Sequence, residues 1–90
     1  MAKVELYTTT LCPYCWRAKR LLDRKGVSYT EYDLWGRSGR REEMLSRAEG
    51  RHTVPQIFIN DRGIGGSDDL ADLEERGELD TLLAADSQAA

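Results

Sequence analysis

Ninety residues, 40% of them hydrophobic and 32% charged, are enough for one small domain with a single core. This composition is typical of a soluble globular protein and excludes a disordered chain. The apolar runs are only a few residues long, so no membrane-spanning helix is expected. The first ten residues, MAKVELYTTT, lack the basic start and apolar stretch of a signal peptide. We therefore expect a cytoplasmic protein that does not associate with membranes.

The formal net charge of −3 is unevenly distributed along the chain. Residues 1–66 carry 12 basic and 8 acidic side chains, a balance of +4, whereas residues 67–90 carry 1 and 8, a balance of −7. The basic part is either a solvated helix face opposite an acidic one or a rim that attracts carboxylate-bearing ligands. Nucleic acid is not expected as a partner, because the total charge is negative and no stacking aromatic motif lies among the basic residues.

The first three predicted elements are a strand, a helix and a second strand. Val4 and Leu6 alternate with polar residues, which predicts the strand. From Cys15 onward apolar residues recur at helical spacing, and Gly26 is expected to cap the C-terminus of that helix. Residues 27–34 alternate and are rich in Tyr, Thr and Val, which predicts a second strand.

A second helix is predicted before Gly50, which is expected to end it. Met44 and Ala48 belong to a single apolar stripe of this helix, which would face the core. Glu43 and Arg47 have the spacing of a favourable i,i+4 ion pair and are expected on its exposed side.

The last third of the chain predicts two more strands and two more helices. Residues 56–59 form a short apolar strand, and Ile64 opens a brief fourth strand after a turn. Ser67 is the expected N-cap of a third helix, whose acidic first turn complements the helix dipole. Gly77 interrupts this helix before a short closing one. The order β-α-β-α-β-β-α predicts an α/β domain.

The only two cysteines of the chain, Cys12 and Cys15, lie at the start of the first predicted helix. A helix N-terminus exposes unpaired N–H groups and a partial positive charge, which favour a thiolate. Pro13 occupies the first helical position, where a missing N–H costs nothing. Cys15 lies over the same helix face and can reach Cys12. The pair is therefore predicted to be an exposed attacking thiol and a shielded thiol that resolves a mixed disulfide.

Three other interpretations of the cysteine pair compete with redox chemistry. A zinc site needs two further ligands, and only His52 is an additional soft donor, so no metal is expected. Two inert core cysteines are a second alternative, although Cys12 lies at a loop–helix junction and not on the apolar stripe. A static disulfide across this short span would be strained and unsuited to the cytosol. We therefore favour redox chemistry.

Three segments, VELYTTTLCPYC, HTVPQIFI and IGGSDDL, carry a family signature. In these segments, and over nearly its whole length, the chain resembles the dithiol (Cys-Pro-Tyr-Cys) glutaredoxins of the thioredoxin-like superfamily. The resemblance implies a thioredoxin-like fold with a central four-stranded mixed sheet and helices on both faces. It also implies one glutaredoxin domain over residues 1–85 and a flexible C-terminal tail over residues 86–90.

The resemblance further implies roles for the residues of the signature. Cys12 would be the nucleophile and Cys15 the resolving thiol of a redox-active disulfide. Pro13, Tyr14 and a cis peptide bond before Pro55 would support them.

Glutathione is the co-substrate that the resemblance implies. The backbone of Val54 would pair with its cysteinyl part. The glycine turn and Ser67 would bind the γ-glutamyl carboxylate, because free N–H groups at a helix start favour an anion. Asp68 would contact the γ-glutamyl ammonium. The expected glutathione-binding residues are Tyr14, Arg40, Thr53, Val54, Gly66, Ser67 and Asp68.

The chain departs from the family before its first cysteine. Family members often carry a lysine there, near the glycyl carboxylate of glutathione, whereas residues 8–10 of this chain are threonines. Arg40 is the expected substitute cation, and Arg37 and Arg41 are the alternatives. The competing interpretation of these arginines is a solvated helix face.

Three functions are compatible with these features. The first is a monomeric oxidoreductase that reduces protein–glutathione mixed disulfides and protein disulfides, with glutathione regenerated by NADPH and glutathione reductase. The second is an iron–sulfur carrier that uses Cys12 and glutathione, which Pro13 disfavours because cluster-binding relatives usually have a smaller residue there. The third is a thioredoxin-like reductant, for which the expected Cys-Gly-Pro-Cys quartet is missing. We expect the first function.

The tryptophans and the histidine lie outside this signature. Trp16 is either a contact for protein substrates or a packed rim residue. Trp35 is expected to cover the edge of the core, and His52 to lie on the surface.

Overall fold

The computed structural model describes residues 2–35 and 39–85, so the predicted tail over residues 86–90 lies outside the described part. Every predicted element is present, although the second strand is shorter than residues 27–34. The elements in chain order are β1 (Val4–Thr8), α1 (Pro13–Arg24), β2 (Thr30–Asp33), α2 (Arg40–Arg47), β3 (Gln56–Ile59), β4 (Arg62–Gly65), α3 (Ser67–Glu75) and α4 (Leu79–Ala84).

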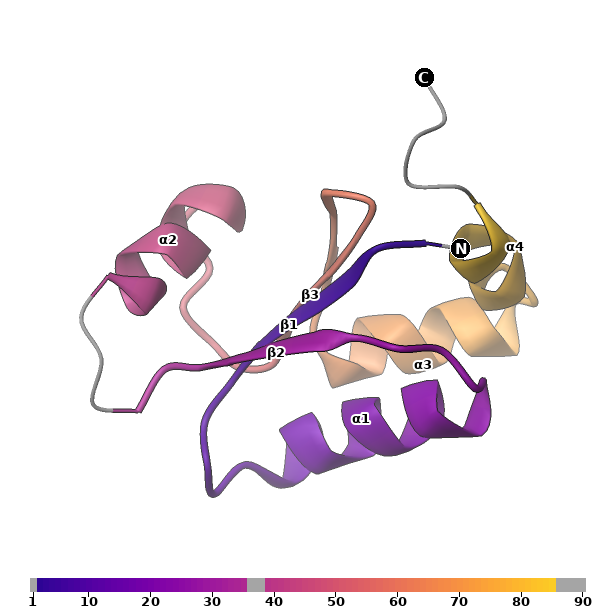
Figure 1. The fold of residues 1–90 in the computed structure, drawn as a ribbon, viewed down its shortest axis with the longest axis horizontal. Helices are drawn as coiled ribbons and strands as arrows, with labels where there is room; N and C mark the ends of the chain where they lie inside the picture. Colours follow the sequence, from indigo (N-terminus) through magenta and orange to yellow (C-terminus); the bar gives the residue numbers. More distant parts are fainter. Residues whose placement is uncertain (1, 36–38, 86–90) are drawn as a thin grey trace.

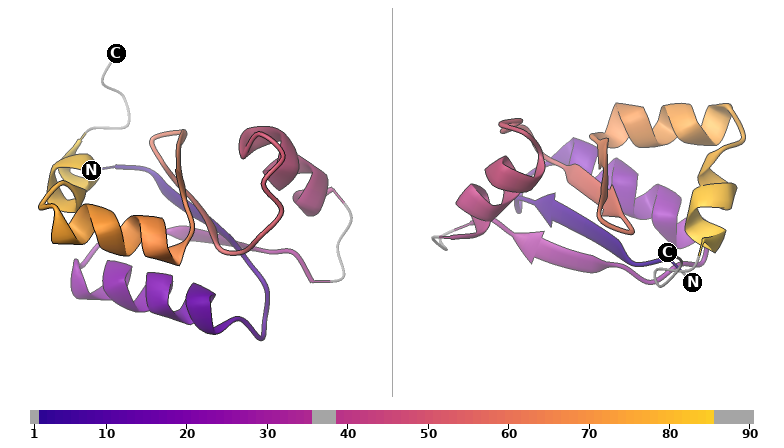
Figure 2. Two further views of the ribbon diagram at one scale, coloured as in Figure 1. Left: turned by 180° about the vertical axis from the view of Figure 1, so that it is seen from behind. Right: turned by 90° about the horizontal axis from the view of Figure 1, so that it is seen from above.

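The four strands form one mixed sheet in the order β2-β1-β3-β4. β1 pairs with β2 in parallel and with β3 antiparallel, and β3 pairs antiparallel with β4. Figure 1 shows α1 and α3 side by side on one face of the sheet and α2 on the other, and Figure 2 shows the same layers from behind and from above. This arrangement is the thioredoxin-like fold, which confirms the predicted fold class.

The face of the sheet beneath α1 and α3 is packed with aliphatic side chains. β1 and β3 contribute alternate residues to it, as the period of a strand requires. This core fixes the helix that begins next to Cys12. Its buried members are Val4, Leu6, Ala18, Leu21, Leu22, Ile57, Ile59, Leu70, Leu73, Leu79 and Leu83.

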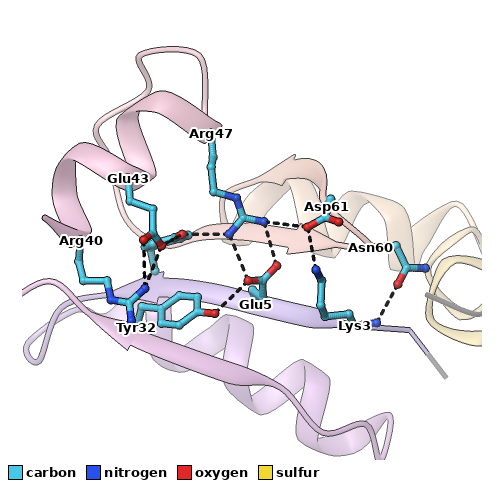
Figure 3. A network of polar contacts seen from close by, with 9 residues as sticks. Lys3, Glu5, Tyr32, Arg40, Glu43, Arg47, Asn60 and Asp61 are labelled. Carbon is cyan, nitrogen blue, oxygen red and sulfur yellow. Dashed lines mark hydrogen bonds and ion pairs between the residues drawn. The ribbon is translucent and has the colours of Figure 1, made fainter. Parts of the chain in front are cut away.

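The face beneath α2 combines an aromatic cluster with buried charge. Tyr7 and Phe58 pack edge to face, with ring centroids 5.8 Å apart. Arg47 extends inward over them and donates to Glu5 at 2.8 and 3.2 Å and to the Tyr7 hydroxyl at 2.9 Å (Figure 3). Its guanidinium lies 4.1 Å from the Phe58 ring centroid. The side chains of Glu5 and Arg47 are 10% and 25% exposed, so this ion pair lies largely out of water.

The predicted ion pair between Glu43 and Arg47 is therefore wrong. Arg47 turns toward the sheet, and Glu43 instead accepts from Arg40 at 3.0 and 3.1 Å and from the Tyr7 hydroxyl. The local i,i+4 spacing is overridden because Glu5 on the sheet offers Arg47 a buried carboxylate with two oxygens.

The expectation for Trp35 is also wrong, because its side chain is 68% exposed and does not cover the core. Trp16 is 53% exposed, which favours the contact interpretation over the packed one. His52 lies on the surface as predicted. No helix among residues 2–35 and 39–85 has the length and apolar character needed to cross a membrane.

Candidate active site

Cys12 is the N-cap of α1. Its backbone is extended, with φ −132° and ψ 102°, and its Sγ accepts the backbone N–H of Cys15 at 3.2 Å. Pro13 occupies the first helical position, as predicted. The cysteine sulfur therefore takes the place that a serine or aspartate oxygen has in an ordinary helix cap. A thiolate at this position is stabilised by the N–H that it accepts and by the helix dipole.

The predicted exposure of Cys12 is not what the structure shows. The residue is only 6% exposed, and its Sγ lies 3.8 Å from the carbonyl oxygen of Val54. The sulfur therefore lies next to Val54, which lines the groove at the start of α1, although Cys12 itself is not one of the lining residues.

Cys15 is fully buried, with no exposed surface. Burial, followed by a hydrogen bond with Cys12, raises the pKa of the Cys15 thiol to about 12. Cys15 therefore stays protonated at neutral pH and is not accessible to a large substrate. Both thiols are free in this structure.

A groove of about 190 Å³ runs from the start of α1 to the start of α3. The peptide bond between Val54 and Pro55 is cis, as predicted, and lies in its wall. The groove brings together six of the seven expected glutathione-binding residues, and Arg40 is the exception. Its lining residues are Tyr14, Arg51, Thr53, Val54, Pro55, Gly66, Ser67, Asp68 and Asp69.

The predicted N-cap of α3 is displaced by one residue. Gly66 is the cap, because its backbone is extended and its carbonyl accepts the N–H of Leu70 at 3.0 Å, so Ser67 is the first helical residue. Asp69 accepts the N–H of Gly66 at 2.8 Å. The N–H groups of Ser67 and Asp68 have no acceptor within the helix and lie where the groove ends. An anion can bind there.

Arg51 is the groove residue that the sequence analysis missed. It lies in the loop before Thr53, and its guanidinium is 3.5 Å from the Asp69 carboxylate. Gly65 allows this approach, because it has φ +113° and an added Cβ would lie 2.8 Å from the Arg51 guanidinium. The only sequence signal was a basic residue two positions before the TVP segment.

The structure places Arg40 outside the groove lining. Its guanidinium lies 4.3 Å from the centroid of the Tyr32 ring and pairs with Glu43 at 3.0 Å. Arg41 is exposed on α2, and Arg37 lies outside the described residues. Among the described residues, Arg51 is therefore the arginine in the groove lining.

In the part of the chain that the structure describes, no three His, Cys, Asp or Glu side chains are grouped so as to hold a metal ion.

Comparisons with known proteins agree with this geometry. The family model described as glutaredoxin matches residues 4–64. A probable glutaredoxin of Synechocystis is 59% identical over 92% of this chain and 76% of its own length, and glutaredoxin 3 of Escherichia coli is 58% identical over 92% and 99%. The crystal structure of a buckwheat glutaredoxin–glutathione complex superposes with a TM-score of 0.82 at 30% identity, over 91% of this chain and 76% of that one. The chain therefore belongs to the glutaredoxin family and has the redox role of its members.

Proposed function

We propose that this protein is a glutathione-dependent disulfide oxidoreductase that reduces protein–glutathione mixed disulfides and protein disulfides. The observation that carries the proposal is the position of the Cys12 sulfur. It caps α1 and lies beside the groove that ends at the first turn of α3. One end of this arrangement favours a thiolate, and the other favours a carboxylate.

The first chemical step is a thiol–disulfide exchange. The Cys12 thiolate attacks the glutathione sulfur of a mixed disulfide, a Cys12–glutathione disulfide forms, and the substrate sulfur leaves as a thiolate that takes up a proton. A second glutathione thiolate then attacks the glutathione sulfur of this disulfide, releases oxidised glutathione and restores the Cys12 thiolate. In the net exchange one free glutathione is consumed: its sulfur is oxidised from thiol to disulfide, and the protein sulfur is reduced from disulfide to thiol.

The second route uses Cys15 and serves protein disulfides. After Cys12 has attacked, Cys15 loses its proton and attacks the Cys12 sulfur of the mixed disulfide, which releases the reduced substrate and leaves a Cys12–Cys15 disulfide. Burial of Cys15 supports this division of roles, because the resolving thiol acts only once a substrate is attached.

Glutathione is proposed to lie along the groove in one orientation. Its cysteinyl backbone pairs with Val54, next to Thr53 and the cis-Pro55, and Tyr14 flanks the peptide. Its γ-glutamyl carboxylate binds at Gly66 and Ser67, and its ammonium binds at Asp68. The likeness to a glutaredoxin solved as a glutathione complex supports glutathione as the ligand. Arg40 remains the proposed partner of the glycyl carboxylate, provided that it gives up its contacts with Tyr32 and Glu43.

The test is a coupled assay with glutathione, glutathione reductase, NADPH and a small mixed disulfide. We expect Cys12→Ser to abolish all turnover, because the buried Cys15 cannot replace it. Cys15→Ser should keep turnover of the mixed disulfide but lose glutathione-independent reduction of a protein disulfide. An equal loss of mixed-disulfide turnover in both variants would show that the roles of the cysteines are wrongly assigned.

An iron–sulfur carrier is the competing proposal, and the visible spectrum of anaerobically purified protein separates the two. A cluster absorption with no turnover in the coupled assay would overturn the oxidoreductase proposal.

We also propose that the protein is a cytoplasmic monomer and that its glutathione is regenerated by glutathione reductase and NADPH.

A further inference from the structure

A second groove, of about 250 Å³, lies between α1 and α3 on the face that carries the aliphatic core. Its apolar part, which we call the floor, is lined by the buried Ala18 and Leu21 and by the exposed Ala71. Its rim is basic, because Arg17, Arg20 and Arg24 recur at i, i+3 and i+7 on one side of α1. We call these three residues the arginine ridge.

The arginine ridge has no internal counterion. All three residues are exposed, and among the described residues none has a carboxylate within 4.0 Å. The neighbouring lysines differ: Lys19 on α1 pairs with Glu31 at 2.9 Å, and Lys25, the C-cap of α1, pairs with Glu74 at 2.7 Å. Among the described residues, the ion pairs of the acidic side chains of α3 are made with arginines and a lysine outside the ridge.

The ridge is continuous with the redox site. Ser67 lines both this groove and the groove beside Cys12. The Arg17 guanidinium lies 5.6 Å from the centroid of the Tyr14 ring, which lines the redox groove. A chain whose sulfur reacts at Cys12 can therefore continue over Tyr14 and Ser67 onto the ridge.

We propose that the arginine ridge docks an acidic segment of the protein substrate while its sulfur reacts at Cys12. This inference rests on the proposed oxidoreductase function. Arginine side chains bind carboxylates bidentately, and unpaired arginines lose no existing ion pair when they do so. The apolar floor accommodates the aliphatic part of such a segment.

The geometry of α1 sets where the carboxylates of the substrate should lie. At a helical rise of 1.5 Å per residue, Arg20 lies roughly 12 Å and Arg24 roughly 18 Å along the axis from Cys12. An extended chain advances about 3.3 Å per residue, so these distances correspond to about four to six residues from the reacting cysteine.

The experiment compares glutathionylated peptides on the full-length protein. The acidic peptide carries glutamates at the fourth and sixth residues from its cysteine. It is made in two versions, one with the glutamates before the cysteine and one with them after it. The matched neutral peptide carries glutamines at the same positions. The variant is Arg20→Gln/Arg24→Gln, which leaves Arg17 on Tyr14. The control is Arg62→Gln/Arg76→Gln, which removes the same charge from a separate groove between β4 and α3. Thermal unfolding establishes that both variants are folded.

For the acidic peptide we expect kcat/KM of the Arg20/Arg24 variant to fall about tenfold at low salt, because the variant loses two exposed ion pairs with the substrate. The loss should shrink at high salt. The glutamine peptide, the small mixed disulfide and the control variant should change less than about twofold. An equal loss for acidic and neutral peptides, or no loss at low salt, overturns the docking proposal. Failure of the wild type to turn over the small mixed disulfide would instead overturn the proposed function.

Discussion

The two faces of the sheet are held by different physical means. Beneath α1 and α3, aliphatic side chains from both helices and two strands pack together. Beneath α2, an arginine reaches a buried carboxylate across two aromatic rings. The first face gains from removing apolar surface from water, which needs no particular orientation. The second depends on hydrogen-bond geometry, because an unpaired buried charge is costly.

This difference corresponds to what each helix does. α1 positions Cys12 as its own N-cap, so the aliphatic face supports the redox sulfur directly. α2 contributes no residue to the redox groove, and its arginines bind the sheet or lie on the surface. Stability and chemistry should therefore respond separately to changes on the two faces.

The largest expected effect is on the aliphatic face. Leu22 is fully buried on α1, and Leu22→Ala should lower the free energy of unfolding by about 2–5 kcal/mol, because it leaves a cavity. Urea denaturation measures this. Leu11→Ala is the control, since Leu11 is 78% exposed and should change stability by no more than about 0.5 kcal/mol. A similar small change at Leu22 would contradict the packing argument.

A smaller loss of unfolding free energy is expected when the ion pair between Glu5 and Arg47 is broken. Arg47→Ala should lower the free energy of unfolding by about 1–3 kcal/mol, because Glu5 is left without its strongest donor. Glu5→Gln in the Arg47→Ala background should then cost less than in the wild type. The iodoacetamide alkylation rate of Cys12 should remain within about twofold of wild type. A large drop in that rate would show that the two faces are coupled.

Protonation of Glu5 at low pH should destabilise the face of the sheet beneath α2. The hydrogen bond and charge of Arg47, opposed by burial, keep the pKa of Glu5 below its usual 4.5. This group stabilises the folded state fully above pH 4.5, and the contribution is lost as the pH falls through the lowered value. The melting temperature of the wild type should therefore fall more steeply below pH 4.5 than that of Glu5→Gln. Equal pH dependence of the melting temperature in the two proteins would argue against a stabilising Glu5–Arg47 ion pair.

The smallest effect is expected at the edge of the same network. Tyr32 donates to Glu5 at 3.0 Å, and Tyr32→Phe should cost about 0.5–1 kcal/mol of unfolding free energy. In the Glu5→Gln background the cost should be smaller, because the acceptor is no longer charged. Urea denaturation of the four proteins of this cycle gives the coupling between the two side chains. If Tyr32→Phe lowers the free energy of unfolding equally with Glu5 and with Gln at position 5, the loss comes from packing and not from the hydrogen bond.

The aliphatic face was predictable from sequence, and the α2 face was not. Periodic apolar residues predicted α1 and its buried side, and Pro13 predicted where the helix starts. Arg47 could not be predicted, because its local spacing indicated Glu43 as a partner and nothing local shows that Glu5 is buried across the sheet.

The candidate site divides in a similar way. The position of the cysteine pair at a helix start was predicted from the residues, and resemblance to the family predicted the cis bond before Pro55 and most of the groove lining. It did not predict Arg51, which lies in a loop without periodicity and meets Asp69 only in the folded chain. The exposure of Cys12 was misjudged, because the Val54 carbonyl that lies beside its sulfur is distant in sequence.

The outer strands of the sheet have a consequence for association between copies of the chain. β2 and β4 form the two edges, and each is only four residues long. Both present charge, with Glu31 and Asp33 on β2 and Arg62 on β4. Short, charged edges are poor templates for the addition of a foreign strand. At high concentration, edge-to-edge aggregation should therefore be slow while the fold is intact, and it should require loss of the native sheet.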